Sequence, residues 1–277
     1  MSEGALTDAN RNLLVRFASA GVLLPLIIVA LWVGPWGTAA LLGIAGLLLA
    51  HELYTIILKR LDFGQVLGML ASAVPPVVFA LWPERFSQVV MVEAVALLIA
   101  LFAYYLLAGP LPEAPSRIAT VFTGFFYCGV LASTVAGLRV LPSGLSWVFL
   151  TLIVTWSNDT GAYAAGRTLG RRKLYPAVSP GKTWEGFFGG MVAAVAAAFI
   201  VKATFFPALS SLDALAIALP LSILGPLGDL SESMLKRAYG VKDWGKIIPG
   251  HGGLLDRVDA LLFNAPYVYL YAVLVHG

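Results

Sequence analysis

The chain has little charge and a single cysteine. Charged residues make up 12% of its 277 residues, about half the share of an ordinary soluble domain. Because Cys128 has no second cysteine to pair with, an internal disulfide is excluded. Cys128 stands in an apolar run with no thiol or histidine nearby, so we expect a small buried hydrophobic residue there. No repeat of fixed period and no low-complexity tract is visible, and an ordinary soluble globular fold is excluded by the shortage of charge.

Apolar sequence is what the chain has in abundance. Hydrophobic residues make up 59% of it, and they fall in runs long enough for a helix to cross a hydrocarbon core of ~30 Å. We therefore predict an all-α fold, a polytopic integral membrane protein with about nine transmembrane helices. The predicted spans are 17–34, 37–58, 65–82, 86–108, 118–140, 145–165, 184–206, 212–230 and 258–275.

The distribution of lysine and arginine predicts an orientation. Of 18 such residues, only Arg85, Arg139 and Lys202 fall on one side of the predicted spans, and the remainder fall on the side of the N-terminus. The positive-inside rule therefore places the N-terminus in the cytoplasm, as in a bacterial-type cytoplasmic (inner) membrane. The charge-rich loops 166–183 and 236–257 then face the cytoplasm, where nucleotides are found. The basic pI reflects these loops and does not indicate a nucleic-acid partner.

Carboxylates gather at the end of the eighth predicted span. Pro226 and Gly228 interrupt the apolar run there and permit a break in the helix. Four polar side chains follow at i, i+3, i+4 and i+7, on one helix face: Asp229, Glu232, Ser233 and Lys236. In a soluble helix this pattern would be a capping box with an i,i+4 ion pair. At the end of a membrane span, an acidic pair favours a functional site.

A glycine-rich stretch, Pro249-Gly250-His251-Gly252-Gly253, precedes the last span and cannot be regular helix. Asp256 and Asp259 follow one turn apart; they could complement the helix dipole, which explains one aspartate better than two. With Asp229 they offer the hard oxygen ligands that suit Mg²⁺ and a polyphosphate. His251 alone is weak evidence. The positive field that phosphates need is supplied by Lys236, Arg237, Lys242, Lys246 and Arg257.

A third polar region lies between positions 156 and 186. Asn158 and Asp159 stand inside an otherwise apolar span, which makes them functional candidates. Ser179 and Pro180 match the N-cap and first position of the next helix. Gly181-Lys182-Thr183 resembles the end of a P-loop, but the first glycine of that motif would fall at Pro176, so the match fails. What remains is a helix N-terminus suited to phosphate.

His51 and Glu52 lie toward the cytoplasmic end of the second predicted span. They could support a site or form a buried pair, and the sequence does not separate these alternatives.

The signature at 233–259 resembles that of the phosphatidate cytidylyltransferases, also called CDP-diacylglycerol synthases. It runs Ser233-x2-Lys236-Arg237-x4-Lys242-Asp243-x-Gly245-x2-Ile248-Pro249-x-His251-Gly252-Gly253-x2-Asp256-Arg257-x-Asp259. The segments Ser157-Asn158-Asp159-Thr160 and Ser179-Pro180-x-Lys182-Thr183-x-Glu185-Gly186 are also similar to that family.

The resemblance implies transfer of a cytidylyl group from CTP to phosphatidic acid, with release of pyrophosphate. It implies Mg²⁺, with Asp229 and Asp256 as metal ligands, and leaves room for a second cation. The implied catalytic residues are Asp229, Lys236, Arg237, Asp256, Arg257 and Asp259. The implied substrate contacts are Asn158, Asp159, Ser179, Lys182, Thr183, Glu185, Ser233, Lys242 and His251.

We expect a single integral membrane domain, 1–277, with more variable spans in 1–140 and the catalytic part in 145–277. The expected partners are CTP, phosphatidic acid and the lipid bilayer. A homodimer is compatible with the sequence, although no motif demands one.

There are two alternatives, a different membrane enzyme and a protein of another class. A CDP-alcohol phosphatidyltransferase would carry a compact aspartate motif that the sequence lacks. A secondary transporter could use Asp159, Asp229 and Glu232 as ligands for a coupling ion on broken helices. Such sites lie near the membrane midplane, usually between repeated halves, whereas this chain shows no repeat. Release of pyrophosphate from nucleotide would separate the enzyme from the transporter.

Overall fold

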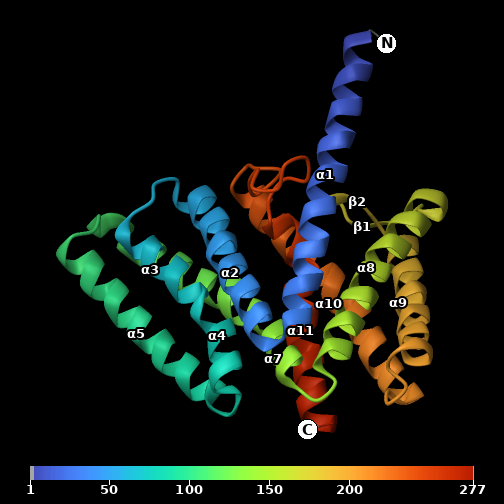
Figure 1. Ribbon diagram of the computed structural model, residues 1–277. Coiled ribbons are helices and arrows are strands. Elements are labelled where there is room, and N and C mark those ends of the chain that lie inside the picture. Colours follow the sequence, from blue (N-terminus) through green and yellow to red (C-terminus); the bar gives the residue numbers. More distant parts are fainter. Residues whose placement is uncertain (1–2, 277) are drawn as a thin grey trace. The chain divides into compact units, whose positions relative to one another are not determined.

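The computed structural model describes residues 3–276, and most of these are helical (Figure 1). The helices are α1 (Glu3–Val33), α2 (Pro35–Leu58), α3 (Phe63–Ser72), α4 (Val74–Leu81), α5 (Phe86–Leu107), α6 (Ala114–Gly124), α7 (Leu131–Val140), α8 (Gly144–Leu169), α9 (Trp184–Thr204), α10 (Ser211–Ala238) and α11 (Leu255–His276). Short 3₁₀ turns occupy Pro83–Arg85 and Leu111–Glu113, a π-helical segment joins α6 to α7 at Phe125–Val130, and two strands, β1 (Lys173–Tyr175) and β2 (Ser179–Thr183), form the only sheet among the described residues.

The all-α membrane fold predicted from the sequence is confirmed. Among the described residues, eight segments are long and apolar enough to cross a membrane. They correspond to eight of the nine predicted spans. The remaining predicted span, 145–165, is also a helix, α8, of 26 residues. It falls outside the set of eight because polar residues such as Asn158 and Asp159 lower the hydropathy of its second half.

The chain forms two compact units. The first consists of Met1–Val130 with Val241–Arg257, and the second consists of Leu131–Gly240 with Val258–Gly277. The boundary in the C-terminal part falls within α11, one turn after its start. The single integral domain expected from the sequence stays a prediction.

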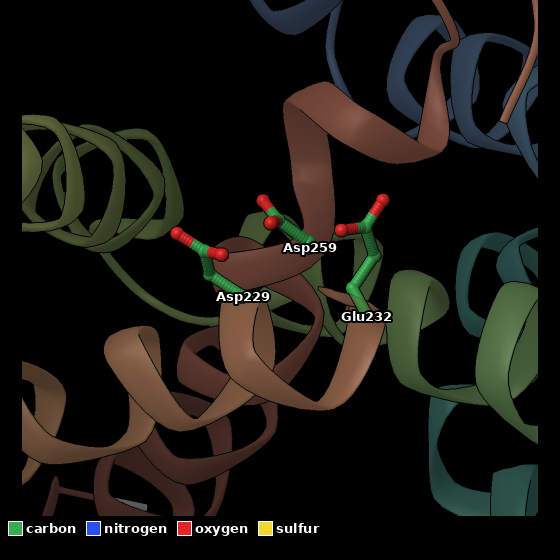
Figure 2. Close-up of side chains that lie close together, drawn as sticks. All are labelled: Asp229, Glu232 and Asp259. Atoms are coloured by element: carbon green, nitrogen blue, oxygen red, sulfur yellow. The ribbon is translucent and has the colours of Figure 1, made fainter. Parts of the chain in front are cut away.

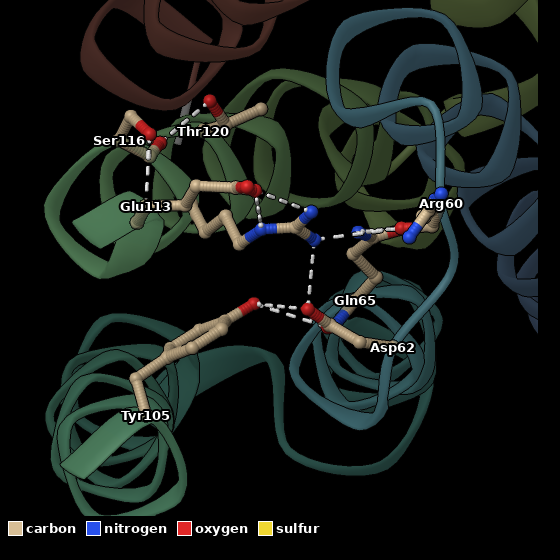
Figure 3. A network of polar contacts seen from close by, with 8 residues as sticks. Arg60, Asp62, Gln65, Tyr105, Glu113, Ser116 and Thr120 are labelled. Atoms are coloured by element: carbon tan, nitrogen blue, oxygen red, sulfur yellow. Dashed lines mark hydrogen bonds and ion pairs between the residues drawn. The ribbon is translucent and has the colours of Figure 1, made fainter. Parts of the chain in front are cut away.

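A buried polar network lies among α3, α5 and α6 of the first unit (Figure 3). Arg117 is only 6% exposed, and its guanidinium lies 2.8 Å from both Asp62 and Glu113. Asp62 also caps α3 by accepting from the amide of Gln65, and it accepts from the Tyr105 hydroxyl. The network satisfies charges that would otherwise be costly within an apolar helical unit.

Small residues let α8 and α9 approach closely in the second unit. A Cβ atom at Gly161 would collide with Ala193, and one at Gly189 would collide with Ala165. Close packing of this kind is typical of membrane helices, which lack a hydrophobic driving force between them. A hydrogen bond of 2.9 Å from Asn264 to Thr155 joins α11 to α8 in the same unit.

The loop 166–183 contains an unpredicted antiparallel hairpin of β1 and β2. The prediction that Ser179 and Pro180 open the next helix is wrong, because they begin β2. The hairpin continues to the amide of Trp184, which donates to the carbonyl of Arg172 at 2.9 Å. Thr183 is the actual N-cap of α9, and its hydroxyl accepts from the amide of Gly186 at 3.1 Å.

The break that Pro226 and Gly228 permit does not occur, because α10 runs without interruption from Ser211 to Ala238 with Pro220 and Pro226 inside it. A proline removes one backbone donor, and a membrane helix tolerates that loss when neighbouring groups satisfy the released carbonyl. The Ser210 hydroxyl and the Asp213 carboxylate form a reciprocal capping box at the start of this helix.

Candidate functional site

A cavity of about 430 Å³ lies within the second unit. Its walls come from α8, the β-hairpin, the start of α9 and the middle of α10. Six residues predicted from the sequence line it: Asn158, Asp159, Ser179, Lys182, Thr183 and Asp229. Segments up to 71 positions apart in the chain, 158 and 229, thus meet at one hollow.

An ion pair crosses this cavity from the hairpin to α10. Lys182 Nζ lies 2.8 Å from Asp229 Oδ2, and the two side chains are 24% and 40% exposed. Lys182 also donates to the carbonyl of Pro226 at 3.4 Å. Ser233, one turn after Asp229, donates its hydroxyl to Asp229 Oδ1 at 3.3 Å. Asp229 is therefore oriented from two sides and stays accessible to a ligand.

Three carboxylates converge beside this pair: Asp229 and Glu232 from α10, and Asp259 from α11 (Figure 2). One oxygen of each lies within 4.8 Å of the others. The donor set consists of hard oxygen ligands, which are those that Mg²⁺ prefers. The residues therefore fit a divalent cation.

Lysines offset part of the negative charge of the acidic cluster Asp229, Glu232 and Asp259. Glu232 is 1% exposed, and its Oε2 lies 2.7 Å from Lys236 Nζ. Lys182 likewise forms an ion pair with Asp229. Three carboxylates held together by helix packing repel one another, and two lysines leave a net negative site. Such a site attracts a cation at its centre while offering ammonium groups to phosphates at its edge.

Two predicted residues bind backbone groups of the second unit. Glu185, at the start of α9, accepts hydrogen bonds from the amides of Arg171 and Arg172, at 3.0 and 3.2 Å from Oε2. Arg237 donates to the carbonyl of Val178, in the turn of the hairpin, at 3.3 Å. Both contacts hold the hairpin against the helices, so these side chains help to fix the shape of the cavity wall.

The glycine-rich part of the signature belongs to the first unit. Asp256 Oδ2 accepts hydrogen bonds from the amides of Trp244 and Gly253, at 3.0 and 3.1 Å. Arg257 donates to the carbonyl of His251 at 2.9 Å. Lys242 is exposed. Because Asp256 and Asp229 lie in different units, a shared metal ion between them stays a prediction.

Sequence reasoning placed Glu232 on the same helix face as Asp229 but did not name it as a Mg²⁺ ligand, and it missed two residues that line the cavity. Glu232 belongs to the acidic cluster, and its spacing of three from Asp229 was the available signal. Tyr163 and Arg167 line the cavity and are joined by a hydrogen bond of 2.9 Å. They follow Asp159 at intervals of four residues along α8, which is the repeat of one helix face.

Comparison with known proteins points in the same direction. The sequence model of the cytidylyltransferase family matches residues 14–275. Over 126 residues the chain is 51% identical to the phosphatidate cytidylyltransferase of Bacillus subtilis, covering 46% of this chain and 47% of that protein. Over 152 residues it is 44% identical to the phosphatidate cytidylyltransferase of Brucella suis, covering 54% and 56%.

A third relative is the uncharacterized protein YnbB of Escherichia coli, 42% identical over 159 residues, which are 56% of this chain and 53% of that protein. The chain thus spans about half the length of the curated relatives it matches. The resemblance that the signature indicated is confirmed at the level of the family.

Proposed function

Because the chain belongs to the cytidylyltransferase family, we propose that it transfers a cytidylyl group from CTP to phosphatidic acid. The products are CDP-diacylglycerol and pyrophosphate. One observation carries the proposal: the Lys182–Asp229 pair lies at the wall of a cavity beside the cluster of Asp229, Glu232 and Asp259. Ammonium groups and carboxylates in one hollow match the needs of a nucleoside triphosphate with its cation.

The reaction is a displacement at phosphorus. An anionic oxygen of the phosphatidic acid phosphate attacks the α-phosphorus of CTP in line. A new P–O bond forms, the bond from the α-phosphorus to the bridging oxygen breaks, and pyrophosphate leaves with the electron pair. The nucleophile is already ionised, so no covalent enzyme intermediate is required. The protein's tasks are to position two anions and to neutralise their charge.

Cations of this chain would carry much of that neutralisation. Lys182 stands at the cavity wall, where it can exchange its contact with Asp229 for a phosphate oxygen. Lys236, Arg237 and Arg257 follow from the family resemblance as further positive groups for the transferring and leaving phosphates. Ser179 and Thr183 offer hydroxyls at the same wall, and Asn158 and Asp159 offer polar contacts from α8.

Asp229, Glu232 and Asp259 would hold the Mg²⁺ ion, which when bound screens phosphate charge and polarises the phosphorus. Asp256 joins this set by the resemblance alone. A second cation is compatible with the additional carboxylate of Asp159, which lines the same cavity.

The lipid setting follows from the eight apolar segments. The acyl chains of phosphatidic acid would stay in the bilayer while its phosphate enters the cavity beside Lys182. We place the cavity on the cytoplasmic side of a bacterial inner membrane, because the positive-inside bias of the sequence supports that orientation. Assembly into a homodimer stays a prediction.

The test is turnover of radiolabelled CTP by purified protein in detergent with phosphatidic acid and Mg²⁺, run beside Asp256→Asn. We expect labelled CDP-diacylglycerol only when the lipid is present, and loss of product in the mutant with its fold intact. Full activity of Asp256→Asn would keep the function and remove this residue from its role. If well-folded wild-type protein makes no product across several lipids and divalent ions, the proposal fails and the transporter alternative gains support.

A further inference from the structure

Glu52 is a buried carboxylate in the apolar helix α2. It is 3% exposed, and a charge in such a place is costly unless it is hydrogen-bonded. Both of its oxygens accept from backbone amides 202 and 203 positions away in the chain. Oε1 accepts from Leu254 at 3.0 Å, and Oε2 accepts from Leu255 at 2.9 Å.

These two amides lie at the start of α11, which begins at Leu255. The first amides of a helix have no partner within the helix, and a negative charge beside them complements the helix dipole. Glu52 therefore caps α11 from another helix of the first unit.

The backbone around Glu52 leaves room for its carboxylate. A Cβ atom at Gly245 would lie 2.6 Å from Glu52 Oε1, and a Cβ atom at Gly253 would lie 3.0 Å from Oε2. Gly253 also donates its amide to Asp256 Oδ2. Glu52 and Asp256 thus fix the same stretch of backbone, and the glycines of the signature are needed where the two carboxylates approach it.

Helix α1 holds the other end of this glycine-rich loop. Arg16 Nε donates to the carbonyl of Gly250 at 2.9 Å, and Ser19 Oγ lies 3.0 Å from His251 Nδ1. Gly250 and Gly252 have φ angles of 77° and 88°, which other residues rarely adopt. The loop 249–256 therefore has an unusual conformation that depends on partners from α1 and α2.

We propose that Glu52 is a positioning residue: its carboxylate holds the start of α11 and the loop 249–256 in the conformation that presents Asp256 and Arg257 for the reaction. This inference rests on the function proposed above. It assigns a role to a residue of the second helix, outside the signature. It predicts that Glu52 acts on the reaction through backbone geometry, without touching substrate.

The experiment compares Glu52→Gln with Glu84→Gln in the full-length protein. The first variant keeps the shape of the side chain, but its amide nitrogen would face a backbone N–H donor, so one hydrogen bond is lost. Glu84 is an exposed glutamate of the same unit and gives the matched control. Amide hydrogen exchange over 244–257 is measured alongside kcat and the Mg²⁺ concentration for half-maximal activity.

We expect at least about tenfold faster exchange at 253–256 in Glu52→Gln, with kcat about 10- to 100-fold lower. The Mg²⁺ concentration for half-maximal activity rises if Asp256 is misplaced. A smaller folded fraction would lower only the maximal activity and would leave that Mg²⁺ concentration unchanged. Exchange and Mg²⁺ dependence equal to those of Glu84→Gln would overturn the inference.

If Glu52→Gln does not fold, Glu52→Asp takes its place in the same assays. Aspartate keeps the charge but has a shorter side chain. Absence of turnover in the wild type would contradict the proposed function but not the structural role of Glu52. Amide hydrogen exchange at 253–256 would still show whether Glu52 holds the loop.

Discussion

Lys182 Nζ lies 2.8 Å from Asp229 Oδ2 and joins the β-hairpin to α10 at the wall of a cavity. This pair links the two segments that the sequence marked as separate candidates, 179–186 and 226–237. It also puts a cation suited to phosphate next to carboxylates suited to Mg²⁺, so a nucleotide and its metal ion can be bound by one hollow of the second unit.

Replacing Lys182 with methionine should weaken CTP binding. The variant keeps the apolar stem but loses the charge that would contact phosphate, and charge-assisted hydrogen bonds are worth about 1.5–3 kcal/mol each. We expect kcat/KM for CTP to fall about 10- to 100-fold, chiefly through KM, in steady-state assays with saturating lipid. Lys202→Met, on the same unit and outside the cavity, is the control. Equal kcat/KM values for Lys182→Met and Lys202→Met would contradict a role for Lys182 in binding the phosphates of CTP.

Asp259→Asn should raise the Mg²⁺ requirement. Asparagine keeps the size of the side chain but removes one charge from the cluster that Asp259 forms with Asp229 and Glu232. Removing a group that supports a metal typically lowers affinity or activity by about 10- to 100-fold. A titration with Mg²⁺ should show this as a shifted midpoint that excess metal partly rescues. A midpoint equal to that of the wild type would place the ion elsewhere.

Arg117→Leu should destabilise the first unit without a direct effect on chemistry. Removing the guanidinium leaves Asp62, 16% exposed, without its ion-pair partner (Figure 3). Loss of one partner from a buried pair destabilises a fold by about 3–5 kcal/mol. Thermal unfolding in detergent should show a clear fall in midpoint.

The matched control for Arg117→Leu is Glu113→Gln, which removes the more exposed partner of the same arginine. Because that carboxylate is 59% exposed, the change should stay within about 1 kcal/mol. Equal losses in the two variants would show that Asp62 does not depend on Arg117.

A cysteine at Arg171 should report the orientation of the hairpin. Arg171 is exposed, whereas the single native cysteine, Cys128, is 0% exposed and should not react. A membrane-impermeant maleimide should label Arg171→Cys in inside-out vesicles and leave it unlabelled in right-side-out vesicles. The reverse pattern would show that the positive-inside bias assigns the wrong side.

Long apolar runs made the helices predictable. Their length and composition alone determine which segments can span a bilayer, so α5 (Phe86–Leu107) and α9 (Trp184–Thr204) lie within a few residues of the predicted 86–108 and 184–206. Short segments carry no such signal. The hairpin was missed because β1 and β2 have only three and five residues, too few for an alternating pattern to be recognised in the sequence.

Local rules failed where tertiary contacts decide. Ser179-Pro180 has the composition of a helix start, yet pairing with β1 takes precedence and Thr183 becomes the cap. Pro226 permits a break in α10, yet the helix continues through it. Glu52 could not be interpreted from sequence at all, because its partners lie 202 and 203 positions away and are backbone amides.

The most direct measurement follows the two ends of the triphosphate. Purified protein is given phosphatidic acid, Mg²⁺ and CTP labelled either at the α-phosphorus or at the γ-phosphorus, and the lipid and aqueous phases are counted separately. Attack at the α-phosphorus predicts α-label in the lipid phase and γ-label in aqueous pyrophosphate, in equal amounts. Label from the γ-position in the lipid, or no label there from either nucleotide, would contradict the cytidylyl transfer proposed for this chain.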